Sequence, residues 1–307
     1  MAEKKYTPMM QHYLKMKEEN PDAILFYRLG DFYEMFFDDA KLASQELDLV
    51  LTGRSAGVEE KVPMCGVPFH AANSYISRLV KKGYKVAICE QLEDPSSAKG
   101  LVDRGIVKII TPGTYMDATM DAKSTNYMAS CSVSSFEITV IYCELSTGEL
   151  KYQTLQRSLV ALQKALLEQN VSELVCPMTM DKKWIAALEE MDTMLVSKHK
   201  KSNIDLQDLP LLNEIESESL KEAFALLMAY LKDTQKQHID HFLPIESMDK
   251  DKVLVMDYET KNHLELVSSQ STNAKAESLW SFMDKCQSAM GSRLLKRWIE
   301  YPLIDAE

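Results

Sequence analysis

The pattern of apolar and polar positions near the N-terminus predicts a strand, a tight turn and a helix in quick succession. Leu25–Leu29 is a short apolar run, a Gly-Asp turn follows it, and a helix is predicted to begin near Asp38. Six of the chain's 25 aromatic residues lie in the twelve positions Phe26–Phe37, too many to be buried around one turn. Alternate residues of an extended segment share one side, so Phe32 and Glu34 are predicted to project together. Burial of Phe32 in the core is the plain alternative, because aromatic side chains are mostly buried.

Residues 1–115 as a whole predict one mixed α/β domain. Arg54 is predicted to lie on an exposed loop, and Gly83 to follow the end of a helix. The cations near that helix end, at positions 78, 81, 82 and 85, fit either a solvated face or phosphate contacts. The predicted helices are 8–20, 39–47 and 70–82, and the predicted strands are 25–29, 48–52, 84–91 and 105–110.

A second domain is predicted at residues 124–250, after a linker at 116–123 that is rich in small polar residues. Three closely spaced strands are followed by helix, strand, helix, strand and a long helix. This order is that of RNase H-like domains. The predicted strands are 127–133, 137–145, 150–155, 173–176 and 193–197, and the predicted helices are 159–168, 182–191 and 220–236.

Residues 251–307 are predicted to begin a mainly helical domain. The apolar run 252–257 suggests a strand, and helices are predicted at 259–268, 275–286 and 289–299. Because Trp280, Phe282 and Trp298 would lack part of their packing, the chain is expected to stop inside a longer protein.

Composition places the chain among ordinary soluble globular proteins, with 46% hydrophobic and 26% charged residues in 307. No apolar run approaches the ~20 residues of a membrane helix, and no signal peptide is evident, so a cytoplasmic location without membrane contact is expected. Six scattered cysteines indicate reduced, buried thiols. His238 and His241 could meet at a helix end, but two ligands are too few to predict a metal site.

The formal net charge of −11 is unevenly distributed. Residues 1–115 and 258–307 each carry a net charge of −1, whereas residues 116–257 carry −9. No segment has the positive charge that is usual for a nucleic-acid domain. Composition by itself therefore does not support DNA binding.

Four segments carry a resemblance to a known family: LFYRLGDFYE at 25–34, VPMCGVPFH at 62–70, AICEQ at 87–91 and IITPGT at 109–114. In this order they resemble the MutS family of DNA mismatch-recognition proteins. The resemblance implies that Phe32 wedges into the base stack at a mispair and that Glu34 hydrogen-bonds to the mispaired base. It also implies DNA backbone contacts by Arg54 and Arg104, with Lys108 as a weaker candidate.

The resemblance implies a domain layout and partners as well. Residues 1–115 would be the mismatch-recognition domain, 124–250 an RNase H-like connector and 251–307 the first helices of an all-α core. Mismatched double-stranded DNA, a MutL-type protein bound through the connector, and a second copy in the full-length protein are the implied partners; the fragment alone is expected to be monomeric. ATP and Mg²⁺ are implied for the full-length protein only. No Gly-Lys dipeptide occurs here, so the chain has no phosphate-binding G-x-x-x-x-G-K-[ST] loop, and neither catalysis nor a cofactor is predicted.

Two other functions deserve comparison. An RNase H-like nuclease needs several converging carboxylates, and the strands after Glu144 offer only Glu173, so Glu144 is predicted to be a surface residue at a strand end. An interaction module that binds protein partners without reading lesions is favoured by the acidic middle and opposed by the intact Phe32-Tyr33-Glu34. Exposure of the Phe32 ring distinguishes the two, because a buried ring could not reach DNA.

Overall fold

The computed structural model of the chain describes residues 6–92, 103–116, 125–205, 208–212, 217–237, 239–248, 253–270 and 278–304. The chain divides into two compact units. The first comprises Met1–Asp117 with Tyr230–His238, and the second comprises Ala118–Ala229 with Ile239–Glu307. Each unit contains its own six-stranded mixed sheet, which confirms the predicted mixed α/β class.

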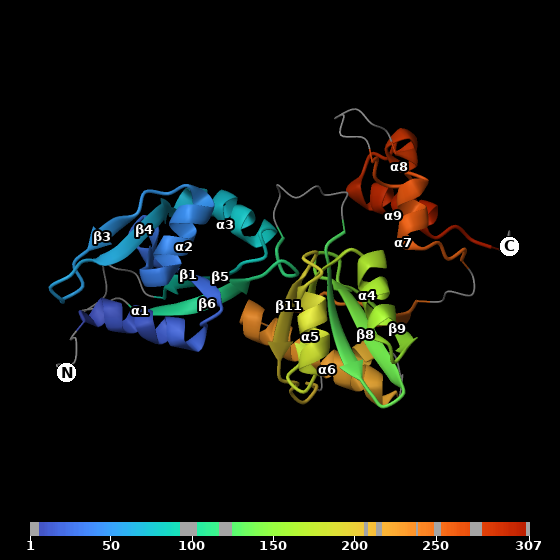
Figure 1. The fold of residues 1–307 in the computed structure, drawn as a ribbon, viewed down its shortest axis with the longest axis horizontal. Coiled ribbons are helices and arrows are strands. Elements are labelled where there is room, and N and C mark those ends of the chain that lie inside the picture. Colours follow the sequence, from blue (N-terminus) through green and yellow to red (C-terminus); the bar gives the residue numbers. More distant parts are fainter. Residues whose placement is uncertain are drawn as a thin grey trace. The chain divides into compact units, whose positions relative to one another are not determined.

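The sheet of the first unit has the strand order β3-β4-β2-β1-β5-β6 (Figure 1). Only the β1–β5 pair is parallel, and the other neighbours are antiparallel. The strands are β1 (Ala23–Leu29), β2 (Phe32–Phe36), β3 (Thr52–Arg54), β4 (Val62–Pro68), β5 (Lys85–Gln91) and β6 (Arg104–Ile110).

Helices cover both faces of this sheet (Figure 1). Helix α1 (Pro8–Glu19) places Met10 and Tyr13 in a core shared with alternate residues of β1, β2 and β5. Helices α2 (Phe37–Leu47) and α3 (Ala72–Lys81) lie on the opposite side, with a 3₁₀ turn (Phe69–Ala71) before α3. Gly83 follows α3 with φ +85°, the left-handed conformation that ends many helices.

A buried carboxylate, Asp39, joins three elements of the first unit. Asp39 belongs to α2, and it accepts hydrogen bonds from the Leu25 backbone N–H of β1 (2.9 Å) and the Tyr13 hydroxyl of α1 (3.2 Å). The Lys17 ammonium of α1 lies 2.8 Å from its other oxygen. Because β1 pairs with β2 only from Tyr27 onward, Asp39 supplies the acceptor that the ladder does not offer to Leu25.

The second sheet has the order β11-β10-β7-β8-β9-β12. Strands β7, β10 and β11 are parallel, and β8 and β9 extend the sheet antiparallel from β7, which is the RNase H-like arrangement expected from the element order. The strands are β7 (Tyr127–Val133), β8 (Glu137–Glu144), β9 (Glu149–Gln156), β10 (Val171–Pro177), β11 (Leu195–His199) and β12 (Glu246–Ser247).

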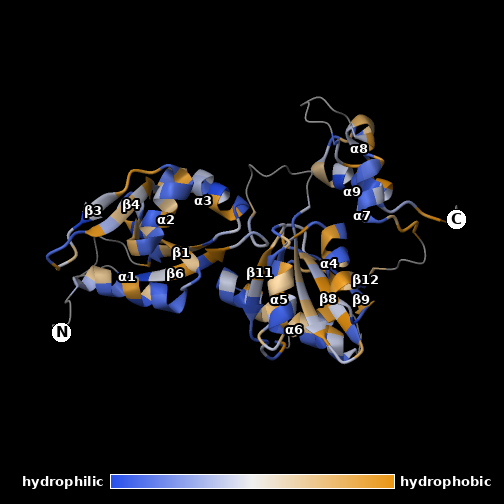
Figure 2. Ribbon diagram, in the orientation of Figure 1, coloured by the Kyte–Doolittle hydropathy of each residue, from blue (hydrophilic) through white to orange (hydrophobic). Residues whose placement is uncertain are grey.

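Helices α4 (Leu159–Glu168) and α5 (Lys182–Glu189) pack their apolar residues on one face of this sheet, in a core that includes Tyr127 and Tyr142. Helix α6 (Glu218–Gln235) contacts β7 through a hydrogen bond from the Ser130 hydroxyl to the Ala223 carbonyl (2.9 Å). Figure 2 shows how hydrophobic residues concentrate in the strands of both sheets. In the described part of the chain, no helix combines the length and apolarity that crossing a membrane requires.

The C-terminal part has less regular structure than its sequence predicts. Val253 makes only an isolated bridge to Leu303, so the strand predicted at 252–257 is wrong. The Asp257 side chain caps Thr260 N–H and starts α7 (Tyr258–His263), which ends early as Glu265 turns to φ +49°. Helices α8 (Leu279–Met283) and α9 (Ala289–Glu300) follow; the helix predicted from residue 275 begins outside the described residues.

Candidate nucleic-acid interface

Phe32 lies directly after the two-residue turn that joins β1 to β2. Gly30 in this turn has φ +58°, a left-handed conformation that glycine adopts at no steric cost. Phe32 pairs with Leu29 on one side and Pro68 on the other, and 47% of its surface is exposed. The ring is therefore available to a partner, as the wedge interpretation requires.

The two ends of β2 differ in burial although their side chains share a face. Phe32, Glu34 and Phe36 alternate along the strand and so project to the same side. Phe36 is fully buried, with its ring centroid 5.0 Å from that of Tyr13 in α1. Helix α1 thus covers the Phe36 end, and the Phe32 end extends beyond this core.

Glu34 forms an ion pair with Arg54, which lies twenty residues further along the chain. The predicted exposed loop at Arg54 is wrong, because Arg54 belongs to β3 and pairs with Val62. Strand β4 (Val62–Pro68), which is not among the predicted strands, supplies the hydrogen-bonding partner for β3. The side chains of Glu34 and Arg54 are 17% and 37% exposed.

Sequence reasoning missed a second exposed aromatic residue near Phe32. Phe69 is 43% exposed, and its backbone N–H donates to the Asp31 carbonyl of the β1–β2 turn (2.9 Å). The Arg28 guanidinium lies 3.8 Å from the centre of the Phe69 ring. The sequence signal that could have identified Phe69 was its position directly after an apolar Val-Pro pair.

Tyr33, on the opposite side of β2, anchors the strand. Its hydroxyl donates to the Glu90 carboxylate of β5, and Arg28 lies 3.9 Å from the same carboxylate. Burial, together with the Glu90 charge, raises the pKa of Tyr33 to about 12. Tyr33 therefore remains a hydrogen-bond donor at neutral pH.

The other two predicted backbone contacts occupy β6. Arg104 is only 8% exposed, its Nε donates to the Arg28 carbonyl (3.0 Å), and its guanidinium lies 5.5 Å from the Tyr27 ring. Arg104 thus fastens β6 to β1 from within the fold, and its phosphate contact stays a prediction. Lys108 is half-buried, and burial lowers its pKa.

The basic cluster at the end of α3 is largely neutralised. Arg78 lies 3.1 Å from Asp48, Lys82 lies 2.6 Å from Glu46 and Lys85 lies 2.7 Å from Asp22. These pairs favour the interpretation of a solvated face with balanced charges.

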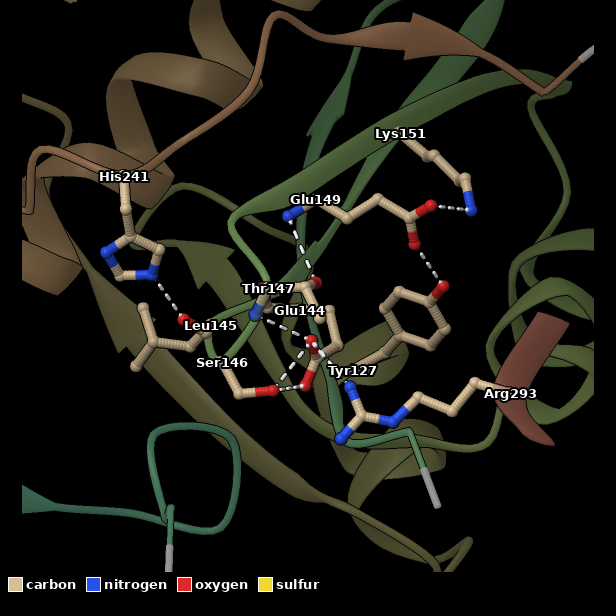
Figure 3. A network of polar contacts seen from close by, with 9 residues as sticks. All are labelled: Tyr127, Glu144, Leu145, Ser146, Thr147, Glu149, Lys151, His241 and Arg293. Atoms are coloured by element: carbon tan, nitrogen blue, oxygen red, sulfur yellow. Dashed lines mark hydrogen bonds and ion pairs between the residues drawn. The ribbon is translucent and has the colours of Figure 1, made fainter. Parts of the chain in front are cut away.

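Figure 3 shows a polar network in the second unit, where β8 turns into β9. Glu144 is only 4% exposed, so the predicted surface position is wrong. The turn folds back onto its carboxylate, which accepts hydrogen bonds from the Ser146 hydroxyl (2.7 Å) and the Thr147 N–H (2.9 Å). Arg293 of α9 lies 3.8 Å away.

Glu149 continues this network at the start of β9 (Figure 3). It accepts a hydrogen bond from Tyr127 (2.7 Å), pairs with Lys151, and lies 3.6 Å from Arg297 of α9. Burial raises the pKa of Glu149, but the hydrogen bonds from Lys151 and Tyr127 outweigh it and lower the pKa overall. Both carboxylates are thus engaged by nearby donors.

Of the two histidines considered as metal ligands, His241 donates from Nε2 to the Leu145 carbonyl (2.7 Å), and His238 lies outside the described residues. Within the described ranges, no group of three or more His, Cys, Asp or Glu side chains could hold a metal ion. All six cysteines are free thiols, five of them buried, as predicted.

An exposed aromatic ring beside a carboxylate, with arginines on other strands of the same sheet, defines a candidate surface for contacting nucleic-acid bases. Residues 7–119 match the family profile of MutS domain I, and residues 259–307 match that of MutS domain III. The chain is 43% identical over 97% of its length to the DNA mismatch repair protein MutS of Bacillus licheniformis. The proteins of the same name from Listeria monocytogenes and Bacillus subtilis are also 43% identical, over 98% and 97% of the chain.

The chain therefore belongs to the MutS family. It spans about a third of the length of these relatives, between 34% and 35%.

Proposed function

We propose that the first unit recognises mispaired or unpaired bases in double-stranded DNA, as the first step of DNA mismatch repair. The observation that carries this proposal is the exposed Phe32 ring beside Glu34, on a part of β2 beyond the core that α1 covers. The match of residues 7–119 to MutS domain I supports it. So do the names of the relatives.

Phe32 would act as a wedge that tests how easily the DNA deforms. Insertion of an aromatic side chain costs a few kcal/mol of unstacking per base step. A mispaired base has already lost part of its stacking and pairing, so the same insertion costs less at a mispair. One residue can therefore select many kinds of mispair without reading a sequence.

Glu34 would accept a hydrogen bond from the mispaired base. A carboxylate close to DNA phosphates is unfavourable unless it finds such a donor, so Glu34 penalises sites that offer none. Arg54, Arg104 and Lys108 are the proposed backbone contacts, which position the protein without specifying sequence. The exposed Phe32 favours this function over a protein-binding module that does not read lesions.

The test measures unstacking directly with 2-aminopurine placed next to a G·T mispair, because this base fluoresces more strongly when it is unstacked. We expect the 307-residue chain to raise the fluorescence of the mispaired duplex and to leave the matched duplex nearly unchanged. Phe32→Ala should abolish the rise.

Phe136→Ala is the matched control, since Phe136 is 88% exposed and belongs to the second unit. An unchanged signal with Phe32→Ala, or an equal loss with Phe136→Ala, would contradict the wedge assignment.

For the longer protein we propose the partners that the family resemblance implies. These are a MutL-type protein that contacts the second unit and a second copy of the chain, with ATP and Mg²⁺ bound outside residues 1–307. The 307-residue chain should then hydrolyse no ATP and bind mismatched DNA weakly. ATP hydrolysis by this chain, or tight and selective binding of mismatched DNA at physiological salt, would contradict this proposal.

A further inference from the structure

We infer that Arg54 is a positioning residue for Glu34: it holds one carboxylate oxygen and leaves the other to accept a hydrogen bond from a base. This inference rests on the proposed function, in which Glu34 contacts the mispaired base. It gives Arg54 a role in discrimination, whereas a contact to phosphate alone would strengthen binding to every duplex.

The register of three strands brings the two side chains together. Glu34 of β2 is opposite Gly66 of β4, and Arg54 of β3 is opposite Val62 of β4, so both project from the same face. To meet Glu34, the Arg54 side chain crosses the row of paired residues that contains Phe36. Its guanidinium lies 5.9 Å from the centre of the Phe36 ring, consistent with that path.

Gly66 leaves space next to the Glu34 side chain. A Cβ atom at position 66 would lie 3.5 Å from Glu34 Cγ and 3.2 Å from the Tyr33 carbonyl oxygen. The distance to Glu34 Cγ is an ordinary contact, whereas the distance to the Tyr33 carbonyl is tight. A Cβ atom here would therefore press mainly on the backbone of β2, and a longer side chain would also compete with Glu34 for space.

The ion pair engages only part of the carboxylate. Arg54 Nη1 contacts Glu34 Oε2, and among the described residues no other hydrogen bond or ion pair involves Glu34. Oε1 is therefore available as an acceptor. The positive charge of Arg54 also offsets the repulsion that Glu34 would meet from DNA phosphates.

The geometry of arginine suits this role better than that of lysine. The planar guanidinium has several donors in a fixed arrangement, so it can orient a carboxylate, whereas an ammonium group acts as a point charge on a flexible stem. Lysine at position 54 would preserve the charge and lose most of the orientation.

The test is a double-mutant cycle on the ratio of affinities for mispaired and matched duplexes. Arg54→Gln should lower this ratio about tenfold, the size expected from losing one hydrogen bond to a charged group, and Arg54→Lys should restore less than half of it on a logarithmic scale. In the Glu34→Gln background, Arg54→Gln should leave the ratio unchanged, because no carboxylate remains to be positioned. Lys108→Gln is the comparison variant and should weaken both duplexes equally. Urea unfolding of each variant shows whether the fold is intact.

An equal loss of affinity for both duplexes in Arg54→Gln would overturn the positioning role and leave Arg54 as a backbone contact. Full rescue by Arg54→Lys would also overturn it. If the unchanged chain shows no preference for mispaired DNA, or if Phe32→Ala does not remove that preference, the proposed function fails first and this inference fails with it.

Discussion

Glu34 in the first unit and Glu144 in the second are both strand carboxylates that face an arginine, yet their surroundings differ. Glu144 is almost fully buried and accepts hydrogen bonds from its own turn, with Arg293 nearby. Glu34 is partly exposed and has Arg54 as its partner. A buried carboxylate with several donors is held in place for the fold, whereas a partly exposed carboxylate with a single partner can accept a hydrogen bond from a new one. The difference separates a structural carboxylate from one that is suited to binding.

The largest expected loss of stability comes from one of the two aromatic side chains that flank Glu34 on β2, and the other should cost little. Phe36→Ala removes a fully buried ring and should lower the free energy of unfolding by about 3–5 kcal/mol. Phe32→Ala removes a ring that is 47% exposed and should cost about 1 kcal/mol or less. Urea unfolding of both variants measures the contrast; similar losses would return Phe32 to the core and remove the basis for the wedge.

Glu144→Ala should have the next largest effect, about 1–3 kcal/mol, because it removes an almost fully buried carboxylate together with its hydrogen bonds from Ser146 and Thr147. Glu144→Gln keeps an acceptor and should cost less. Calorimetry or urea unfolding can compare the two. A loss below about 0.5 kcal/mol for Glu144→Ala would mean that water replaces the carboxylate, and that Glu144 is no more structural than Glu34.

The stability of the second unit should depend on pH through Glu149, which belongs to the same polar network as Glu144. The pKa of Glu149 is lower in the folded chain than its unfolded value of about 4.3. Its contribution to stability is therefore present above that unfolded value and is lost as pH falls through the lower folded pKa. Between pH ~5 and ~3, Glu149→Gln should flatten the fall of the unfolding free energy with acidity. An unchanged slope in Glu149→Gln would show that Glu149 does not cause the fall of the unfolding free energy with acidity.

The smallest effect should belong to the Glu34–Arg54 pair. Both side chains are partly exposed, so Glu34→Ala should change the free energy of unfolding by less than about 1 kcal/mol. The same variant should change DNA discrimination, which gives it a binding phenotype without a stability phenotype. A loss comparable to that of Glu144→Ala would remove the contrast between the two carboxylates.

Sequence periodicity predicted β1, β5 and β6 of the first sheet and β7 to β11 of the second, because their apolar runs are bounded by turn residues. Strand β7 and helix α4 lie where predicted. Strand β4 was not predicted, because its Val-Pro-Met-Cys-Gly-Val-Pro run contains two prolines and a glycine, residues that usually argue against a strand. Without β4, Arg54 could not be assigned to a strand.

The candidate site was predictable in part. Phe32 and Glu34 follow from alternation in β2 together with the family resemblance. The Glu34–Arg54 pair and the exposed Phe69 depend on cross-strand register, which local sequence does not determine. Burial of Glu144 depends on hydrogen bonds from its own turn and on the nearby α9 arginine.

The Asp39 junction has a consequence for how variation in this chain should be interpreted. The hydroxyl of Tyr13 and the ammonium of Lys17 belong to α1, whereas Asp39 starts α2, directly after the strand that carries Phe32. Formation of the hairpin of β1 and β2 is thus cooperative with packing of the N-terminal helix α1. A substitution at Lys17, which lies outside the site, should raise the population of chains in which the β1–β2 hairpin is unfolded, and should thereby weaken the mispair recognition that we propose for the first unit. Such an allele would be temperature-sensitive, unlike one at Phe32 itself.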